Sequence, residues 1–202
     1  MKNSLVKDAL ILTLITLVAG VALGGVYEIT KGPIAVAEAA AVAAAYREVF
    51  ADASDFNEVA DFDAEAASAF VQGAGFADDD INACVQAVDS SGNPLGYVIT
   101  VTSHAGYGGD ITFSVGITND GTVNGYSITS ISETAGLGMK ATEDKFKSQF
   151  NGIPAGVYEV TKATAGDNEI EAISGATITS RAMTYGVNAA IAYFNNITGG
   201  GQ

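Results

Sequence analysis

The sequence contains very few of the residues on which metal centres and many active sites depend. Among its 202 residues there is one cysteine, Cys84, and one histidine, His104. A single cysteine excludes an internal disulfide, and one histidine without a second thiol excludes a transition-metal cluster or a Cys/His nucleophile pair within the chain. We therefore predict no metal site and no catalytic residue. We interpret Cys84, which lies in an apolar stretch, as a small buried residue.

Two widespread sequence motifs of nucleotide and ester chemistry are also absent. The chain has no G-K-[ST] phosphate loop and no G-x-S-x-G serine elbow. Without G-K-[ST], the chain lacks the usual phosphate-binding loop. Without G-x-S-x-G, it lacks the motif that marks the nucleophile of a serine hydrolase. Any phosphate-bearing ligand must therefore be held in another way.

Positive charge is scarce after the first 31 residues. Residues 32–202 hold six of the nine Lys/Arg but 21 of the 23 Asp/Glu, a net charge of −15. Such a surface repels phosphate backbones and anionic headgroups, so we predict no nucleic-acid partner. Residues 51–80 carry nine acids and no basic residue. A solvated acidic face is one interpretation of this segment, and a calcium site is the other, although EF-hand spacing is absent.

The longest uncharged run lies near the N-terminus, where Ala9 to Tyr27 comprise 19 residues. As a helix this run extends about 28 Å, close to the ~30 Å hydrocarbon core of a bilayer. We therefore predict an uncleaved single-pass anchor in contact with membrane lipid. A cleavable signal peptide is the alternative, because Ala35–Ala37 has the small-x-small pattern of a cleavage site.

The charges that flank this run predict its orientation. Lys2 and Lys7 precede it, whereas Glu28 and Lys31 cancel each other after it. By the positive-inside rule, the N-terminus lies in the cytoplasm. The rest of the chain would then lie outside the cell (inner) membrane.

The remainder of the chain shows the patterns of an α+β fold. From Ala83 onward, short β-branched and aromatic runs are separated by Gly, Asn and Asp clusters, as in an antiparallel meander. We expect helices over 33–50, 141–150 and 178–195, and edge strands over 156–161 and 169–174. The sequence therefore predicts an antiparallel sheet packed with helices after the transmembrane helix.

Three glycine-containing stretches suggest a ligand site. They are "HAGYGGDI" (104–111), "ETAGLG" (133–138) and "SGATITS" (174–180). Glycines let backbone amides approach a flat or phosphorylated ligand, and a helix N-terminus offers unpaired N–H groups to phosphate. For the third stretch there is an equally simple alternative, in which Thr177 or Thr179 is only the N-cap of the last helix.

The same stretches carry a resemblance to a known family. "EAISGATITS" resembles the flavinylation motif D-x-x-[ST]-G-A-T, in which an acid stands six residues before the acceptor threonine. "ETAGLG" is similar to the E-T-P-G-L-G loop of the same proteins. Together they resemble the G subunit of the Rnf ion-translocating electron-transport complex, and more distantly the C subunit of the sodium-translocating NADH:quinone reductase. Glu171 replaces the usual Asp and Ala135 the usual Pro, and neither change removes a reactive group.

This resemblance implies a cofactor and a set of site residues. FMN would be joined by a phosphoester to Thr177, in a reaction catalysed by a flavin transferase that consumes FAD. Residues 1–31 would then be the cytoplasmic end and transmembrane helix, 32–80 a helical and acidic connecting region, and 81–202 the FMN-binding domain. The implied cofactor-binding residues are Thr177, Ser174, Gly175, Ala176, Glu133, Thr134, Leu137, Gly138 and Tyr107.

The resemblance also implies a role and partners. The chain would relay electrons within an ion-translocating ferredoxin:NAD+ oxidoreductase (Rnf) complex, beside the other membrane subunits of that complex, rather than act as a complete enzyme. Two alternatives stay open. One is an extracytoplasmic flavin-binding domain of a different membrane reductase, and the other is a non-redox membrane-anchored binding or structural protein. A pilin would need a Gly before its apolar run and a Glu five residues into the mature chain, and the sequence has neither.

Overall fold

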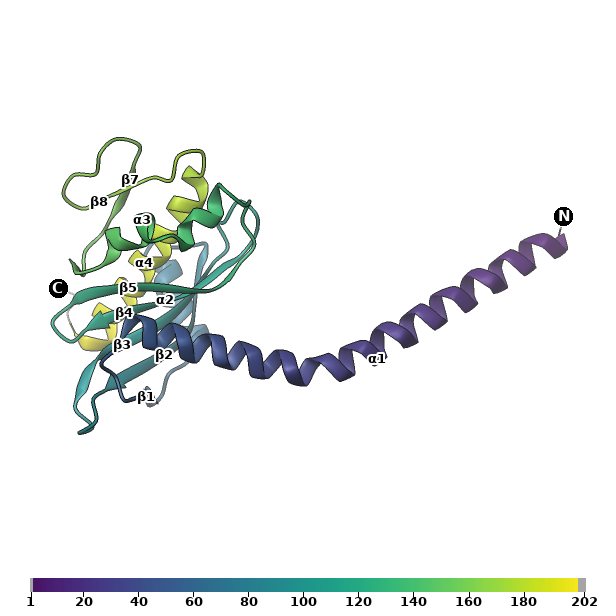
Figure 1. The fold of residues 1–202 in the computed structure, drawn as a ribbon, viewed down its shortest axis with the longest axis horizontal. Coiled ribbons are helices and arrows are strands. Elements are labelled where there is room, and N and C mark those ends of the chain that lie inside the picture. Colours follow the sequence, from purple (N-terminus) through teal and green to yellow (C-terminus); the bar gives the residue numbers. More distant parts are fainter. Residues whose placement is uncertain (1, 200–202) are drawn as a thin grey trace. The chain divides into compact units, whose positions relative to one another are not determined.

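The computed structural model describes residues 2–199, with side chains from Val6 onward, as two compact units, Met1–Ala41 and Val42–Gln202. Met1 and residues 200–202, the two ends of the segments predicted from the sequence, lie outside the described residues. The side chain of Lys2 is also not described. The first element, α1, is a single helix of 48 residues, Lys2–Val49 (Figure 1). It continues through Pro33, where the sequence suggested the first turn of a separate helix.

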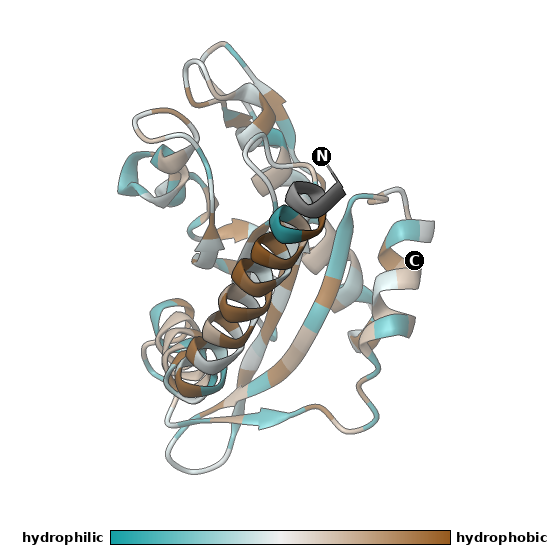
Figure 2. Cartoon of the chain, turned by 90° about the vertical axis from the view of Figure 1, so that its right-hand side faces the viewer, coloured by the Kyte–Doolittle hydropathy of each residue, from teal (hydrophilic) through white to brown (hydrophobic). Residues whose placement is uncertain are grey.

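Residues 9–27 of α1 carry no charge, and Figure 2 shows mostly hydrophobic residues along the N-terminal half of this helix. The hydroxyls of Thr13, Thr16 and Thr30 each donate to the carbonyl four residues before them, so they need no external partner. By length and composition, this is the one helix among the described residues that could cross a membrane, and its candidate region is Val6–Val49.

The second unit is built on a six-stranded antiparallel sheet with the order β1-β2-β3-β4-β5-β6. Its strands are β1 (Asp55–Glu58), β2 (Asp79–Val88), β3 (Pro94–Ser103), β4 (Ile111–Thr118), β5 (Thr122–Ile131) and β6 (Ile153–Pro154). Each strand pairs with its neighbour in sequence, which is the predicted meander. Together with the apolar N-terminal helix, this confirms the predicted fold class.

Helices cover one face of this sheet. The last helix, α4 (Thr177–Thr198), crosses β2, β3 and β4, and α2 (Ala64–Gly73) packs beside it against β2 (Figure 1). The largest fully buried side chains of this core include Phe113, Tyr126 and Phe150, which stack edge to face. The buried face of α4 includes Ala182, Val187 and Ala189, and small side chains let the helix lie close to the strands.

The last turns of α1 cover the other face of the sheet. Val49 and Phe50 form a second cluster with Val85, Ala87 and Val98 of β2 and β3. Because side chains alternate along a strand, Val98 points to this cluster while the adjacent Ile99 belongs to the main core. Where β2 and β3 meet this cluster, the sheet is therefore buried on both faces.

Polar contacts fasten the same end of α1. Glu48 accepts hydrogen bonds from the Ser127 hydroxyl and from Lys147, and Asn124 Nδ2 donates to the Val49 carbonyl at 3.0 Å. Close approach also depends on Gly116, since a Cβ added there would lie 2.8 Å from Val49 Cβ. Residues 42–49 are thus part of the folded domain.

Gly116→Val should therefore destabilise the domain by about 1–3 kcal/mol, because the added side chain displaces Val49 and uncovers the second cluster. The matched control is Gly73→Ala, where an added Cβ meets no atom within 4 Å. This control should be neutral or slightly stabilising. Urea unfolding of both full-length variants in detergent, followed by circular dichroism, measures the difference. Equal midpoints for the two variants would contradict the docking of α1 on the sheet.

Several predicted elements differ in detail from those of the structure. The helix predicted over 141–150 is broken into η1 (Gly138–Thr142), α3 (Asp144–Lys147) and η2 (Ser148–Phe150). The two predicted edge strands, β7 (Glu159–Thr161) and β8 (Glu169–Glu171), pair with each other in parallel and do not join the main sheet. The acidic segment contains both β1 and α2, and Asp63 is the N-cap of α2.

Candidate functional site

The three glycine-containing stretches meet around one cleft of about 410 Å³. It is lined by Tyr107, Glu133, Thr134, Leu137, Gly138, Gly175, Ala176, Thr177, Ile178 and Thr179. Eight of the nine residues predicted to bind a cofactor are in this set. The exception is Ser174, which is exposed and lines a neighbouring cavity instead.

The turn before α4 presents Thr177 to the cleft. Gly175 adopts a left-handed backbone (φ 80°), and Ala176 is the N-cap of α4 without any side-chain capping bond. Thr177 is the first helical residue and is half-buried, so the alternative in which Thr177 or Thr179 is the N-cap is wrong. The first intrahelical bond joins the Ser180 amide to the Ala176 carbonyl, which leaves the amides of residues 177–179 free.

A hydroxyl that sequence analysis had not assigned holds this turn in place. Ser180 Oγ accepts a hydrogen bond from the Ile173 amide at 2.9 Å and donates to the Ala176 carbonyl at 2.9 Å. Ser180 is fully buried. The four hydroxyl residues of "SGATITS" therefore have different surroundings: Thr177 and Thr179 line the cleft, Ser180 fixes the shape of the turn, and Ser174 lines the neighbouring cavity. The signal was available, because a serine one turn inside a helix can bond back to the carbonyl four residues earlier.

The Glu133 side chain connects its own loop to the loop 104–111 and lies close to α4. Its side chain is buried, and Oε1 accepts a hydrogen bond from the Tyr107 amide at 2.7 Å. A Cβ added to Gly138 would lie 2.5 Å from Glu133 Oε2 and 2.7 Å from Thr179 Oγ1. Glycine at 138 is thus what lets the loop, the carboxylate and α4 come together. Glu133 both lines the cleft and holds its wall.

Exposed apolar side chains form the rim of the cleft. Tyr107, Ile178 and Leu137 are 71%, 50% and 42% exposed. Exposed apolar groups that gather beside a concave site usually mark a place where a ligand or partner is received. The cleft therefore combines free helix-terminal amides, threonine hydroxyls and an apolar rim, which suits a flat ring with a phosphate tail.

Comparison with known proteins gives this arrangement a family. Residues 1–49 match the family model of the RnfG N-terminal region, and residues 106–192 match that of the FMN-binding domain. The chain is 35% identical over 195 residues to the G subunit of the Na(+)-translocating ferredoxin:NAD(+) oxidoreductase complex of Acetobacterium woodii, covering 95% of this chain and 92% of that one. The chain belongs to the RnfG family. This confirms the resemblance drawn from its motifs.

Two further relatives support the assignment to the RnfG family. The G subunit of the ion-translocating oxidoreductase complex of Methanosarcina acetivorans is 31% identical over 195 residues, covering 95% of each chain. The G subunit of the proton-translocating ferredoxin:NAD(+) oxidoreductase complex of Clostridium ljungdahlii is 40% identical over 114 residues, covering 56% of this chain and 61% of that one. The crystal structure of Shewanella oneidensis NqrC shares the fold, with a TM-score of 0.51 at 20% identity over 59% of this chain and 62% of that one.

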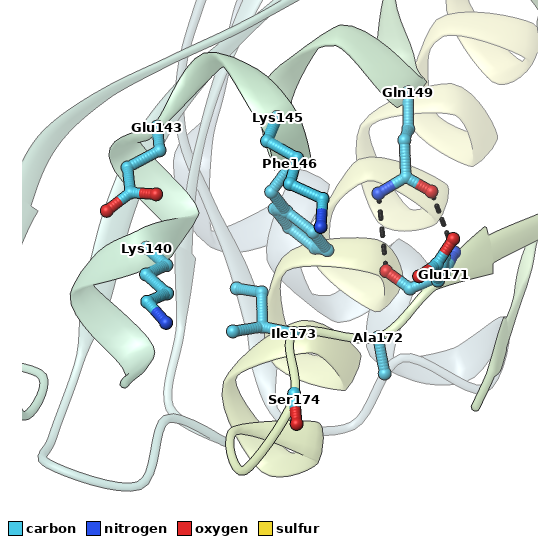
Figure 3. A pocket seen from close by; sticks show the side chains of 9 residues that line it. All are labelled: Lys140, Glu143, Lys145, Phe146, Gln149, Glu171, Ala172, Ile173 and Ser174. Carbon is cyan, nitrogen blue, oxygen red and sulfur yellow. Dashed lines mark hydrogen bonds between the residues drawn. The ribbon is translucent and has the colours of Figure 1, made fainter. Parts of the chain in front are cut away.

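A second cavity of this RnfG domain, about 310 Å³ in volume, lies on the other side of the turn before α4 (Figure 3). Figure 3 shows Lys140 and Lys145 extending from one wall, opposite Ile173 and Ser174. On the far side, the Gln149 side chain accepts from the Glu171 amide at 2.7 Å and donates to its carbonyl at 3.2 Å. Gln149 thus holds the backbone at the start of the stretch "EAISGATITS".

A buried carboxyl lies where β2 begins. Asp79 is 2% exposed, and its Oδ1 and the Oγ of the adjacent Ser103 have no hydrogen-bond partner among the described residues. Burial raises the pKa of Asp79 from 3.8 to about 6. Because the folded pKa lies above the unfolded one, the ionised carboxylate disfavours the fold. The stability of the domain is therefore lowered as the pH rises from about 4 through 6.

Asp79→Asn should remove this penalty, since the amide keeps the shape of the carboxyl without its charge. At pH 8 the variant should be more stable than the natural chain by about 2 kcal/mol, and near pH 4 the gain should vanish. Urea unfolding of the full chain at both pH values measures it. A gain that is the same at pH 4 and pH 8 would show that the charge of Asp79 is not its cause.

Proposed function

We propose that this chain is the membrane-anchored redox subunit of an ion-translocating ferredoxin:NAD(+) oxidoreductase complex, and that it relays electrons through FMN joined covalently to Thr177. The observation that carries the proposal is the cleft itself, where the Thr177 hydroxyl, the free amides of α4 and the glycine-rich loops converge. Family membership adds the electron-transport context, since its relatives bear the name of complex subunits. Other subunits of such a complex would be its partners.

Attachment of FMN through a phosphoester would transfer the FMN part of FAD to the Thr177 hydroxyl. In the proposed attachment, the Thr177 oxygen would bond to the FAD phosphorus that bears the riboflavin, the pyrophosphate bond would break with release of AMP, and a base of the flavin transferase would take the hydroxyl proton. Thr177 is the nucleophile of choice in this turn, because it lines the cleft while the Ser180 hydroxyl is already engaged with Ile173 and Ala176.

Residues of the chain would hold the two ends of the cofactor differently. The phosphodiester would keep one negative charge near the amides at the start of α4, where the helix dipole would contribute about 0.3–1 kcal/mol. Leu137, Ile178 and Tyr107 would pack on the ring. Bound FMN supplies reversible electron transfer, and the exposed rim leaves one edge open to a redox partner.

A covalent tether also suits the charge of the domain. Residues 32–202 carry six basic and 21 acidic residues, so the field around the cleft disfavours a free phosphate dianion. A covalent bond holds the flavin without requiring affinity against that field. It also prevents loss of the flavin by dissociation where free flavin is scarce.

The proposed location follows from α1 and its flanking charges. With Lys7 on the cytoplasmic side, the domain that begins at Val42 would face away from the cytoplasm. Protease added to intact cells, or to spheroplasts if there is an outer membrane, should then digest the domain and leave a membrane fragment. Full protection of the domain would reverse this topology.

In-gel fluorescence tests the proposed function. The full chain, produced together with a flavin transferase, should give a fluorescent band under ultraviolet light after denaturation. Flavin that survives denaturation must be covalently bound. A dark band from cells with active transferase would contradict covalent flavin, and would leave the non-redox binding protein as the better interpretation.

A further inference from the structure

The histidine of this chain lies between two carboxylates. His104 Nδ1 is 2.9 Å from Asp110 Oδ1, and His104 Nε2 is 3.0 Å from Asp80 Oδ2. A neutral imidazole carries only one N–H, and an ionised carboxylate can only accept. Both contacts are therefore hydrogen bonds only when the ring is protonated. The pKa of His104 is accordingly raised, first by its hydrogen bond to Asp80 and then by the one to Asp110.

These contacts close the glycine-rich loop, His104–Asp110, which connects β3 to β4. The bond between His104 and Asp110 joins the two ends of the loop, and the bond to Asp80 fastens both to β2. At the middle of the loop, the Tyr107 amide donates to Glu133 Oε1 in the cleft. The loop is also closely packed, because a Cβ added to Gly108 would lie 2.3 Å from the Ser132 carbonyl oxygen.

We propose that His104 is a positioning residue for the cleft: as an imidazolium it binds Asp80 and Asp110 together, holds Tyr107 against Glu133, and releases this wall when it loses its proton. The loop movement rests on the residues of this chain alone. Its consequence for a flavin rests on the proposed function, because Tyr107 and Glu133 would both border the ring.

The charged groups around His104 set the direction of the pH effect. Asp80 and Asp79 lie near it at the start of β2, the backbone carbonyl of Asp78 accepts a hydrogen bond from the His104 amide at 2.7 Å, and Asp110 lies at the far end of the loop. From α2, the Gln72 amide donates to the second oxygen of Asp80 at 2.8 Å and keeps that carboxylate in place. A raised histidine pKa means that the clamp is complete below about pH 6.5 and is lost as the pH rises through the folded value.

Hydrogen exchange of the Tyr107 amide measures the clamp directly. The full chain in detergent, produced without flavin transferase, is compared at pH 6 and pH 9 after correction for the intrinsic exchange rate. We expect protection of Tyr107 to fall about tenfold at the higher pH, in line with loss of a hydrogen bond to a charged group. Amides of α4 serve as the internal reference and should not change. Equal protection of Tyr107 at both pH values would overturn the proposal.

Three variants separate His104 from its neighbours. His104→Gln should show the low protection at both pH values. Asp110→Asn should stay protected at pH 9, because an asparagine amide can donate to the neutral ring while Nε2–H still donates to Asp80. Asp79→Asn should keep the natural profile, and loss of the pH effect in that variant would assign it to Asp79 instead. Because these experiments use a chain without flavin, a negative result contradicts only the role of His104. The attachment of flavin to Thr177 is tested separately by in-gel fluorescence.

Discussion

Thr177→Ala should give a folded, membrane-bound protein that carries no flavin after denaturation. The loss should be complete, because the substitution removes the half-buried hydroxyl at the first position of α4, which lines the cleft, whereas the Thr179 side chain is 1% exposed. The helix should persist, since Thr177 makes no capping bond and alanine has the higher helix propensity. In-gel fluorescence and the intact mass of the purified chain measure the change.

Thr179→Ala is the matched control for this substitution. Thr179 is 1% exposed and lies deeper in α4, with its hydroxyl beside Glu133 and Gly138 rather than open to a modifying enzyme. This variant should remain fluorescent, with at most a modest loss of stability. Peptide mass spectrometry of the segment 163–181 locates the adduct. An FMN adduct on Thr179, or one that persists in Thr177→Ala, would show that Thr177 is not the acceptor.

Glu133→Gln should leave the flavin attached and raise its reduction potential. Attachment depends on Thr177 at the start of α4, whereas Glu133 belongs to the loop 133–138 that also lines the cleft. A nearby negative charge disfavours added electrons, so neutralising it makes reduction easier. The shift should be a few tens of millivolts, given that 30 mV corresponds to about 1.4 kcal/mol for a two-electron couple. Spectroelectrochemical titration of the flavinylated chain measures it.

Glu133→Ala extends this test from charge to position. It removes the acceptor of the Tyr107 amide as well as the charge, and an unpaired buried N–H costs about 1–3 kcal/mol. We expect flavin to stay attached, the potential to shift as in Glu133→Gln, and Tyr107 to become more mobile. If both variants keep the natural potential and the natural turnover in the assembled complex, the loop 133–138 does not belong to the flavin site.

The sheet and the last helix follow from local patterns that the sequence displays openly. The runs that became β3 and β4 are β-branched and bounded by glycine, and the apolar positions of 178–195 recur at helical spacing. The pairing of strands that are distant in the sequence cannot be predicted from such local patterns. The sequence of β7 and β8 suits any short strand, and nothing in three residues tells whether the partner is the sheet edge or another short strand.

In the site, too, the residues of contiguous motifs could be predicted, whereas contacts between separate elements could not. The motif that contains Thr177 could be located by resemblance, and so could "ETAGLG", because both are contiguous in the chain. The closeness of Glu133 to Thr179 could not, since it joins residues from separate elements and depends on the space that Gly138 leaves. Ser174 was predicted with its neighbours by contiguity alone. The turn at Gly175 carries it to the far side, into the second cavity.

The docked end of α1 has a practical consequence for preparing a soluble fragment. An intuitive cut would remove the whole of α1 and start the fragment after Phe50. That fragment would bare Val85, Ala87 and Val98 to water and leave Lys147 without Glu48, so it would be prone to aggregate. Starting near Val42 discards the apolar membrane segment yet retains the two helical turns that the sheet uses as its second cover.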